Sequence, residues 1–246
     1  MLPENSERND RTEEITRFVE SQEYADLHCH LLPGIDDGAR DIGDTELLLH
    51  LQKLQNVSNI AFSPHFYPEQ ERFKPYLRRR EKAIEKVLAD PNLKDGFRFK
   101  FWSEVHIAPS VAKMDLRKLS LDEKYVLLEF PFQTNPVWGD YILDCCKDAG
   151  LTPVLAHVER FPYFTLKELY RLKEKGCILQ SNAGFILKHQ RDYAEIAELV
   201  DVIASDAHNS TWRNPNLKRA YCLLTEKYGE EYVERLIKNS MNIFGE

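Results

Sequence analysis

The chain has 246 residues, of which 43% are hydrophobic and 30% are charged. This length fits a single α/β barrel, and the apolar share is enough for a sizeable core, which excludes intrinsic disorder and a coiled-coil rod. Thirty-three Lys and Arg residues against forty Asp and Glu residues give a formal net charge of -7. This sign argues against nucleic acid as a partner, because binding a duplex needs a basic surface that neutralises phosphates.

No segment has the pattern of a signal peptide or a membrane span. Residues 1–14 are polar and mixed in charge, and no stretch approaches about 18 uninterrupted apolar residues. The five cysteines are odd in number and lack C-x-x-C spacing, which argues against a disulfide framework and a thiolate zinc site. We therefore expect a cytoplasmic protein in a reducing compartment, not an integral membrane protein.

Two parts of the chain are expected to differ in role. Residues 1–24 are charged, with weak helical spacing in Ile15, Phe18 and Val19, and they predict an N-terminal extension that docks without chemistry. Residues 25–246 contain no repeat or flexible linker, so we expect them to form one domain. The sequence leaves open what the extension does and whether the protein is a homo-oligomer.

Strand-like apolar runs alternate with helical patterns through residues 25–246. Apolar residues have helical spacing within residues 47–54, 83–87, 142–146 and 166–172. Gly150 and Gly176 follow two of these stretches, where a left-handed residue at the end of a helix favours glycine. The seven strand-like runs are Ala25–His28, Ile60–Ser63, Phe97–Phe101, Tyr125–Glu129, Pro153–Ala156, Ile178–Gln180 and Val202–Ala204.

This alternation predicts a parallel sheet, either open or closed into a barrel. A residue able to bind a metal ion, ionise or hydrogen-bond lies near the C-terminal end of each of the seven runs. Sites built from strand ends all around a sheet are typical of a barrel mouth, so the predicted fold class is an α/β, TIM-like barrel. The residues concerned are His28, His30, His65, Glu104, Glu129, His157, Asn182, Asp206 and His208.

The strongest local signal is the histidine pair in Asp26-Leu27-His28-Cys29-His30. Residues two apart on a strand project to the same face, so both imidazoles can reach one ion while Cys29 points the other way. Histidine and carboxylate ligands without sulfur suit Zn, Mn or Fe(II), and a bridging carboxylate allows more than one ion to bind. The further ligand candidates are His65, Glu104, His157, Asp206 and His208.

A turn-rich loop directly after the paired histidines contains two further carboxylates. Asp37, followed by Gly38, is the candidate for metal ligation or proton transfer, whereas Asp36 could equally cap the following helix. Three other histidines are not assigned to the site. His50 and His189 are expected to have no role, and His106 either points away from the ligands or supports them from behind.

Arg160 and Arg213 each follow a ligand histidine closely. Guanidinium groups bind phosphate through paired hydrogen bonds, so two of them beside a metal site predict phosphate-ester hydrolysis, with a surface salt bridge as the alternative for each. The run Arg78–Arg80 is instead expected to be a solvated helix face. The chain lacks the G-x-S-x-G, P-loop and Rossmann motifs and an arginine-rich loop after a cysteine, which disfavours the corresponding enzyme classes.

Four segments together resemble a known family. They are Asp26–Ala39, Ser63–His65, Ala156–Arg160 and Ala204–Asn209. The chain resembles the PHP (polymerase and histidinol phosphatase) superfamily from about residue 24 to residue 244, and more narrowly its CpsB/CapC-type bacterial tyrosine phosphatases. The resemblance implies a distorted (β/α)7 barrel with three divalent metal ions, Mn, Fe or Zn. It also implies that the substrate is phosphotyrosine on a partner bacterial tyrosine kinase controlling capsular or exopolysaccharide export. The extension before Asp26 departs from the family pattern.

The resemblance also implies a role for each candidate residue. His28, His30, Glu104 and Asp206 would hold one ion; His65 and His157, with Glu104 as the bridge, a second; and His208 with Asp37 a third. Arg160 and Arg213 would bind the phosphate. Asp37 or an imidazole such as that of His208 would assist the leaving group.

The hydrolysis expected of such a site is direct. A hydroxide made available by the metals would attack phosphorus in line, and a phenolate, with a conjugate-acid pKa of about 10, needs only modest help to leave. Two other functions stay open: a small-molecule phosphatase acting, for instance, on histidinol phosphate, and a non-catalytic metal-binding partner of the kinase. Aromatic residues near the motif loops either wall a site for a substrate ring or pack in the core and rim; they are Phe66, Tyr67, Phe132, Phe161, Tyr163 and Trp212.

Overall fold

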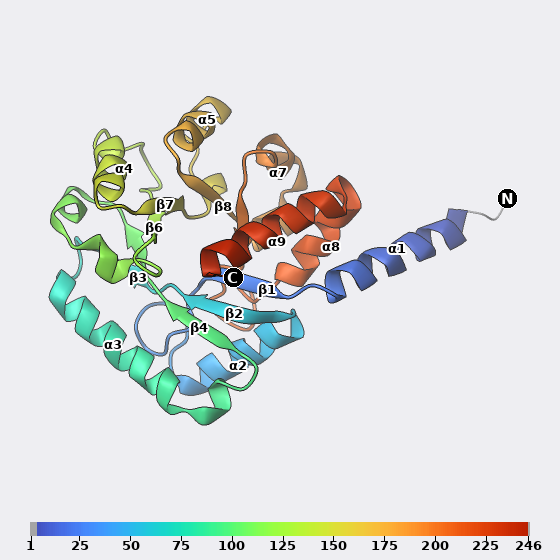
Figure 1. Ribbon diagram of the computed structural model, residues 1–246, viewed down its shortest axis with the longest axis horizontal. Helices are drawn as coiled ribbons and strands as arrows, with labels where there is room; N and C mark the ends of the chain where they lie inside the picture. The colour runs from blue at the N-terminus through green and yellow to red at the C-terminus, as the bar shows by residue number, and fades with distance from the viewer. Residues whose placement is uncertain (1–3, 246) are drawn as a thin grey trace.

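Parallel strands and helices alternate along the chain in the computed structural model, which describes residues 4–245 (Figure 1). One sheet has the strand order β1-β2-β4, and the other has the order β3-β5-β6-β7-β8-β9. Every pairing between these strands is parallel. The strands are β1 (Tyr24–Cys29), β2 (Val57–Phe62), β3 (His65–Phe66), β4 (Arg98–Phe101), β5 (Glu104–His106), β6 (Tyr125–Glu129), β7 (Thr152–Leu155), β8 (Ile178–Asn182) and β9 (Val202–Ala204).

The strands follow one another around a curled surface. A parallel bridge between Cys29 and Ala207 brings the end of β1 beside the segment that follows β9. The first and last strands of the chain are therefore neighbours, as the predicted α/β architecture requires. All seven predicted runs are strands, and the two short strands β3 and β5 were not predicted.

The helices predicted from apolar spacing are all present. Asp41 caps the first of them by accepting a hydrogen bond from the Asp44 backbone N–H. Gly150 and Gly176 have left-handed φ angles of 74° and 81° directly after α4 and α5, as predicted. The helices are α2 (Ile42–Leu54), α3 (Phe73–Ala89), α4 (Gly139–Asp148), α5 (Leu166–Glu174), α6 (Ala183–Lys188), α7 (Gln190–Ile196), α8 (Leu217–Tyr228) and α9 (Glu230–Phe244). Short 3-10 turns are η1 (Pro91–Leu93), η2 (Pro109–Lys113), η3 (Leu116–Leu119) and η4 (Val158–Arg160).

The core lies on both sides of the strands. Apolar faces of the outer helices, such as Leu48 of α2 and Leu169 of α5, belong to the larger buried cluster. A smaller cluster joins alternate strand residues, including Leu27 and Val154, to Phe244 at the end of α9. Because α9 also contacts β1 and β9, it fixes the two strands from which several candidate ligands extend (Figure 1).

Helix α1 (Glu4–Glu20) projects from the rest of the chain (Figure 1). Its last turns dock as predicted, because Ile15, Phe18 and the fully buried Val19 pack against the core, and Lys218 of α8 pairs with Glu20 at 2.8 Å.

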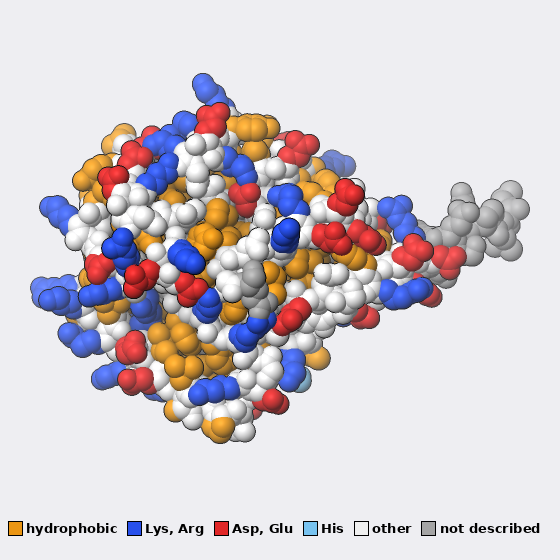
Figure 2. Space-filling view, viewed as in Figure 1, with side chains coloured by type: hydrophobic (Ala, Val, Ile, Leu, Met, Phe, Trp, Pro, Cys, Tyr) orange, Lys and Arg blue, Asp and Glu red, His pale blue; other side chains and the backbone are white. Residues whose placement is uncertain are grey.

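Figure 2 shows acidic and basic side chains interspersed over this face of the molecule. The division into an extension of residues 1–24 and a domain of residues 25–246 stays a prediction. Within residues 4–245 no helix is long and apolar enough to cross a membrane.

The expectation of a solvated face at Arg78–Arg80 is wrong for one of its members. Arg80 is partly buried, and its guanidinium donates to Ser103 Oγ at 2.8 Å and to the Lys118 carbonyl oxygen at 2.6 Å. Burial lowers the pKa of this guanidinium. Arg80 therefore ties α3 to the loop that precedes β5.

Candidate metal centre

Side chains alternate between the two faces of β1 and of the residues that extend it, and this alternation determines which of them face the candidate metal centre. His28 and His30 are fully buried, and their Nε2 atoms lie 3.1 Å apart. Cys29 points the opposite way, where its Sγ lies 3.7 Å from the Ala61 carbonyl oxygen. The sequence prediction for this strand is therefore confirmed.

Glu104, the first residue of β5, lies at the middle of the site and is fully buried. Its Oε2 atom is 2.8 Å from His65 Nδ1, 3.2 Å from His28 Nε2 and 3.3 Å from His30 Nε2. Its other oxygen, Oε1, is 2.8 Å from His157 Nε2. One carboxylate thus faces four imidazoles, which is the arrangement of a bridging ligand.

The segment after β9 contributes a carboxylate and an imidazole. Asp206 has a left-handed φ of 51°, which is uncommon for a residue with a side chain. This backbone turns its Oδ1 atom to within 3.4 Å of His30 Nε2 and its Oδ2 atom to within 2.7 Å of Arg213 Nη2. His157 is also left-handed, with φ 34°. Strained backbone at two candidate ligands is typical of functional sites.

The hydrogen bonds behind three histidines fix their neutral tautomers. His28 Nδ1 donates to Gln180 Oε1 at 3.0 Å, and this amide oxygen is identified because it also accepts from the His157 backbone N–H. His30 Nδ1 donates to Asp36 at 2.8 Å, and His208 Nδ1 donates to the Asp206 carbonyl oxygen at 3.0 Å. With the hydrogen on Nδ1, each neutral ring presents the lone pair of Nε2, as a metal ligand must.

Asp36 and Asp37 have different surroundings. Asp36 accepts hydrogen bonds from His30 Nδ1, from the His65 backbone N–H at 2.9 Å and from the Gly38 backbone N–H at 3.0 Å. It does not cap the following helix, so that alternative is wrong; Asp41 is the cap. The interpretation missed that Asp36 could support a ligand histidine.

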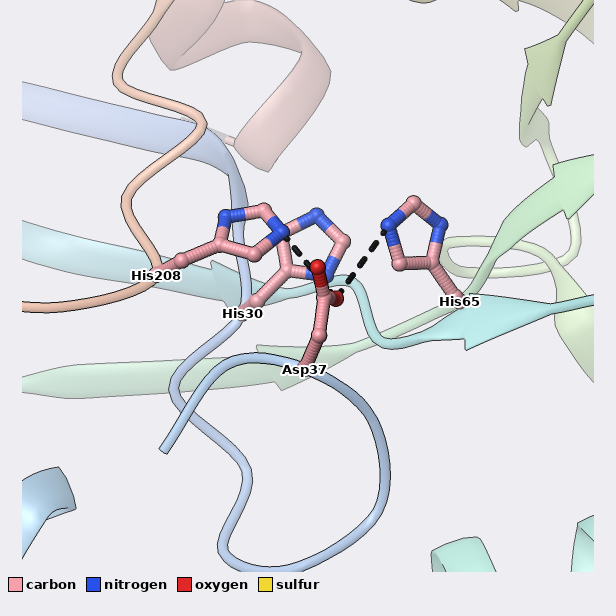
Figure 3. Close-up of side chains that lie close together, drawn as sticks. All are labelled: His30, Asp37, His65 and His208. Atoms are coloured by element: carbon pink, nitrogen blue, oxygen red, sulfur yellow. Dashed lines mark ion pairs between the residues drawn. The ribbon is translucent and has the colours of Figure 1, made fainter. Parts of the chain in front are cut away.

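Asp37 lies at the mouth of the site, where its side chain is 65% exposed. Its Oδ1 atom is 3.3 Å from His208 Nε2 and 3.6 Å from His65 Nε2 (Figure 3). Gly38, the next residue, passes so close to His30 that an added Cβ would lie 1.9 Å from the His30 carbonyl oxygen. The loop can therefore reach the histidines only with glycine at this position.

Burial and neighbouring charges have opposite effects on the pKa values of several groups in the site. Burial lowers the pKa of His28, but the carboxylates of Glu104 and Asp206 raise it above its ordinary value overall. Burial would raise the pKa of Glu104, yet the neighbouring imidazoles hold it well below its usual range. Burial and the His30 ring lower the pKa of His208 to about 4, and the adjacent His208 ring lowers the pKa of Asp37. Buried carboxylates thus balance positive charge that protons or metal cations can supply.

The donor set fits divalent cations. Buried Glu104 Oε2, Asp206 Oδ1 and His208 Nε2 have no hydrogen-bond partner of good geometry, although all three point into the cluster. Nitrogen and carboxylate donors of this kind suit Zn, Mn or Fe(II). Four overlapping groups have donor atoms within 4.8 Å of one another: His30, Asp37, His65 and His208; His28, Glu104 and His157; His28, His30 and Asp206; and His65, Glu104 and Glu129. His65 and His157, assigned together by the resemblance, both contact Glu104 but fall in different groups.

Four further residues lie around the candidate ligands. Glu129 and Asn182 were noted at strand ends without an assigned role, His106 was expected either to point away or to support the ligands from behind, and Gln180 was not predicted. Glu129 Oε1 lies 3.7 Å from His157 Nε2, and His106 supports Glu129 from behind at 3.1 Å. Gln180 Nε2 donates to Asn182 Oδ1, and Asn182 Nδ2 donates to Asp206 at 2.7 Å. Gln180 lies two residues before Asn182 and so projects to the same face of β8, which is the sequence signal that could have identified it.

Both predicted phosphate-binding arginines lie beside the cluster. Arg213 makes the 2.7 Å contact with Asp206 described above, and Arg160 Nη1 is 3.7 Å from the same carboxylate. The Arg160 guanidinium also stacks over Phe132, 4.8 Å from the ring centre. His50 is exposed on α2, and His189 stacks on Phe185 away from the cluster, so neither joins it.

The aromatic candidates divide between core and rim. Phe66 is fully buried in the core, so it cannot touch a substrate. Tyr67 stacks on His65, and Phe161 lies between His157 and Tyr163. Phe132 and Trp212 are 43% and 73% exposed, which leaves these two as free aromatic surface at the rim.

Comparison with known proteins places this geometry in a family. The profile described as "Capsular polysaccharide synthesis, CpsB/CapC" matches residues 24–245. The chain belongs to the CpsB/CapC family. The matched region contains every candidate ligand and both arginines, whereas α1 lies outside it.

Curated CpsB/CapC relatives are similar over most of their length. Tyrosine-protein phosphatase YwqE of Bacillus subtilis (strain 168) is 31% identical over 229 residues, covering 87% of this chain and 89% of the relative. Tyrosine-protein phosphatase CpsB of Streptococcus pneumoniae is 28% identical over 232 residues, covering 86% and 93%. A solved structure, from work on YwqE and CpsB as unique metal-dependent tyrosine phosphatases, has a TM-score of 0.77 at 27% identity and covers 89% of this chain and 94% of that one.

Proposed function

We propose that this chain is a metal-dependent protein-tyrosine phosphatase. The observation that carries the proposal is the buried Glu104 carboxylate, which faces four imidazoles beside two arginines. The names of the CpsB/CapC relatives support the same activity. Divalent ions held by this donor set would provide a water-derived nucleophile near neutral pH and offset charge on the phosphate oxygens.

The two arginines would orient the phosphate. Arg213 and Arg160 both point at Asp206, so an incoming phosphate finds guanidinium donors already gathered at the edge of the cluster. Paired N–H donors bind phosphate oxygens and stabilise charge that develops on them during in-line attack. Attack by a water-derived nucleophile needs no nucleophilic side chain and no covalent enzyme intermediate.

Asp37 is the residue proposed to act on the leaving group. It is exposed at the mouth, close to His208 and His65, where the bridging oxygen of a bound phosphate ester would emerge. A phenolate leaves readily, since its conjugate acid has a pKa of about 10. Help from Asp37 or His208 can therefore be modest. Because the pKa of each group lies below its ordinary value, either would act by orienting a water beside the leaving oxygen rather than by holding the proton itself.

Several finer features belong to the same proposal. We infer a distorted (β/α)7 barrel, in which β3 and β5 continue β2 and β4 after breaks of two residues each. Three ions, each Mn, Fe or Zn, would be held as the resemblance implies, with Glu129 as a further donor. The protein substrate would be a bacterial tyrosine kinase of capsule or exopolysaccharide synthesis. Five cysteines without a disulfide fit a reducing, cytoplasmic setting.

The deciding experiment compares three substrates on the purified chain. Rates are measured on a phosphotyrosyl peptide, a phosphoserine peptide and histidinol phosphate, each with Mn and with a chelator. We expect Mn-dependent hydrolysis that is fastest on the phosphotyrosyl peptide. Faster turnover of histidinol phosphate would replace the proposal with a small-molecule phosphatase, and inactivity on all three would leave a metal-binding regulatory protein.

Two variants separate metal binding from phosphate binding. His30→Ala should lower bound metal and turnover together, because His30 contacts both Glu104 and Asp206. Arg213→Ala should retain metal yet weaken phosphate binding by about 2–5 kcal/mol, the cost of removing one partner of a buried charge pair. Metal content and inhibition by inorganic phosphate are measured for both. Loss of metal in the Arg213 variant would contradict its assigned role.

A further inference from the structure

A groove leads away from the metal centre along α6 and the loop that precedes α8. Its volume is about 740 Å3, within the range of about 300–1,000 Å3 typical of ligand pockets. At the inner end it is lined by Arg160, Arg213 and Asp206. At the outer end it is lined by Lys188 of α6 and Arg219 of α8. We call these four basic residues, together with the cavity between them, the basic groove.

The charge of this groove is opposite to that of the whole chain. Four basic side chains line it against two acidic ones, Glu159 and Asp206, whereas the chain has a net charge of -7. The two acidic groups are already engaged, because Asp206 pairs with Arg213 and Glu159 accepts a hydrogen bond from the Asn182 backbone N–H. Their charges therefore do little to neutralise the outer end of the groove.

The two outer cations, Lys188 and Arg219, are available for binding. Lys188 and Arg219 are exposed, and neither forms an ion pair within the part of the chain that the structure describes. Other exposed basic residues, such as Lys82 and Lys86 of α3, likewise form no ion pair among residues 4–245, so what distinguishes Lys188 and Arg219 is their position in the groove. Unpaired cations at the open end of a groove that begins at the metal centre are available to an anionic ligand.

The size and walls of the groove suit a polypeptide. An exposed ring, Trp212, and the partly buried ring of Phe185 line it, so it has apolar surface besides its charges. Lys188 and Arg219 come from helices on which no candidate metal ligand lies. Lys188 and Arg219 are therefore suited to bind residues next to the phosphorylated side chain rather than the phosphate itself.

We propose that the basic groove binds acidic residues flanking the phosphotyrosine of the protein substrate, with Lys188 and Arg219 as specificity-determining residues. This inference rests on the proposed tyrosine phosphatase activity. Aspartate or glutamate carboxylates would replace water around the two outer cations while Arg160 and Arg213 bind the phosphate. Exposed charge pairs contribute modestly and are screened by salt, so the preference is expected to be graded and sensitive to ionic strength.

The test uses the Mn-loaded full chain and four phosphotyrosyl peptides. One has neutral flanks, one has three Asp residues before the phosphotyrosine, one has three Asp residues after it, and one has Lys residues on both sides. The measured quantity is kcat/KM for each peptide relative to the neutral one, at low and at high salt. We expect at least one acidic peptide to be preferred by about three- to tenfold at low salt, with the preference falling at high salt.

A charge-reversal pair identifies the residues responsible. In Lys188→Glu/Arg219→Glu the preference for the acidic peptide should disappear or invert. The matched control, Lys82→Glu/Lys86→Glu on the exposed face of α3, makes the same change in net charge away from the groove and should keep the preference. Equal preference in both double variants would overturn the assignment to these residues, because the effect would then come from net charge or from elsewhere.

The outcomes also separate this inference from the activity on which it rests. If the unmodified chain hydrolyses all four peptides at equal rates, the phosphatase proposal stands and the basic groove has no role in choosing substrates. If it hydrolyses none of them with Mn, the proposed activity itself fails. A preference for the Lys-flanked peptide would overturn the inference directly.

Discussion

The position of one hydrogen on His30 depends on Asp36. The carboxylate accepts from His30 Nδ1 and also from two backbone N–H groups, those of His65 and Gly38. Asp36 thereby holds the His30 ring in the tautomer that presents Nε2 to the cluster, and it links two candidate ligands. Its pKa is low, because the imidazoles of His30 and His65 outweigh the effect of burial.

We expect Asp36→Asn to lower metal affinity by about 10- to 100-fold, as loss of such an outer hydrogen bond does elsewhere. The amide can donate to His30 Nδ1, which would move the imidazole hydrogen to Nε2, facing the cluster. A metal titration monitored by calorimetry measures the affinity of each variant. Asp41→Asn, at the exposed helix cap five residues along, is the control and should bind metal normally. Unchanged affinity in the Asp36 variant would show that this bond is dispensable.

Gly38 gives a second prediction at the same scale. An alanine Cβ there would lie 1.9 Å from the His30 carbonyl oxygen and 2.5 Å from His30 Cβ, so backbone must move. Gly38→Ala should lower the free energy of unfolding by about 1–3 kcal/mol and reduce bound metal. Gly43→Ala, which has an ordinary φ within α2, is the control for both readouts. A Gly38 variant as stable and metal-rich as this control would mean that the loop relaxes freely.

At the scale of elements, Arg80 connects a helix to the sheet loops. Its guanidinium donates to Ser103 Oγ and to the Lys118 carbonyl oxygen, next to the strand that begins with Glu104. Arg80→Met removes a donor from the buried Ser103 Oγ and from the exposed Lys118 carbonyl oxygen, and the buried contact should make it cost about 1–3 kcal/mol of unfolding free energy. Arg78→Met, on the exposed side of the same helix, should change it by less than about 0.5 kcal/mol. Unfolding both variants with denaturant measures the two free energies. Equal losses would contradict the proposed connection between α3 and these loops through Arg80.

The longer elements could be predicted from periodicity, but short ones could not. The apolar spacing within 47–54 and 166–172 identified α2 and α5, and apolar runs identified seven strands, including the three-residue β9. The two-residue β3 and three-residue β5 contain ionisable residues, His65, Glu104 and His106, and so form no apolar run. Arg80 was misinterpreted because a run of three arginines suggests a surface, whereas helical geometry turns only some of its members toward the sheet.

Single residues were predictable where a strand ended in a ligand, as at His28, His157 and Asp206. The residue missed, Gln180, acts through hydrogen bonds whose partners depend on tertiary contacts. Its spacing of two from Asn182 is a weak signal, because it does not identify the histidine that the amide contacts. The preference for Asp37 over Asp36 was also incomplete, because both carboxylates approach the histidines from one loop.

Across the whole molecule, proton and metal binding are linked at one buried cluster. Burial alone would lower the pKa of His28 and of His30, but the surrounding carboxylates raise both above the ordinary value, so these rings hold their protons to higher pH before metal binds. A metal ligand must be the neutral imidazole, so loading should release protons wherever these rings are still protonated. Metal affinity should accordingly increase as the pH rises past the raised pKa values of His28 and His30.

Calorimetric metal titrations in two buffers of different ionisation enthalpy measure this release. The apparent binding enthalpy should differ between the buffers in proportion to the protons released. His30→Ala removes one of the two titrating rings and should reduce the difference. Identical enthalpies in both buffers at pH 7 would show that the rings are already neutral.

The bridge between Cys29 and Ala207 has a consequence for how the protein is made. His28 and His30 leave the ribosome early, whereas Asp206 and His208 follow only after more than four-fifths of the chain has been synthesised. A nascent chain therefore cannot assemble the full donor set, however much of its first half has folded. Any ion that needs Asp206 or His208 would consequently be captured late, and fragments released prematurely would lack the complete cluster.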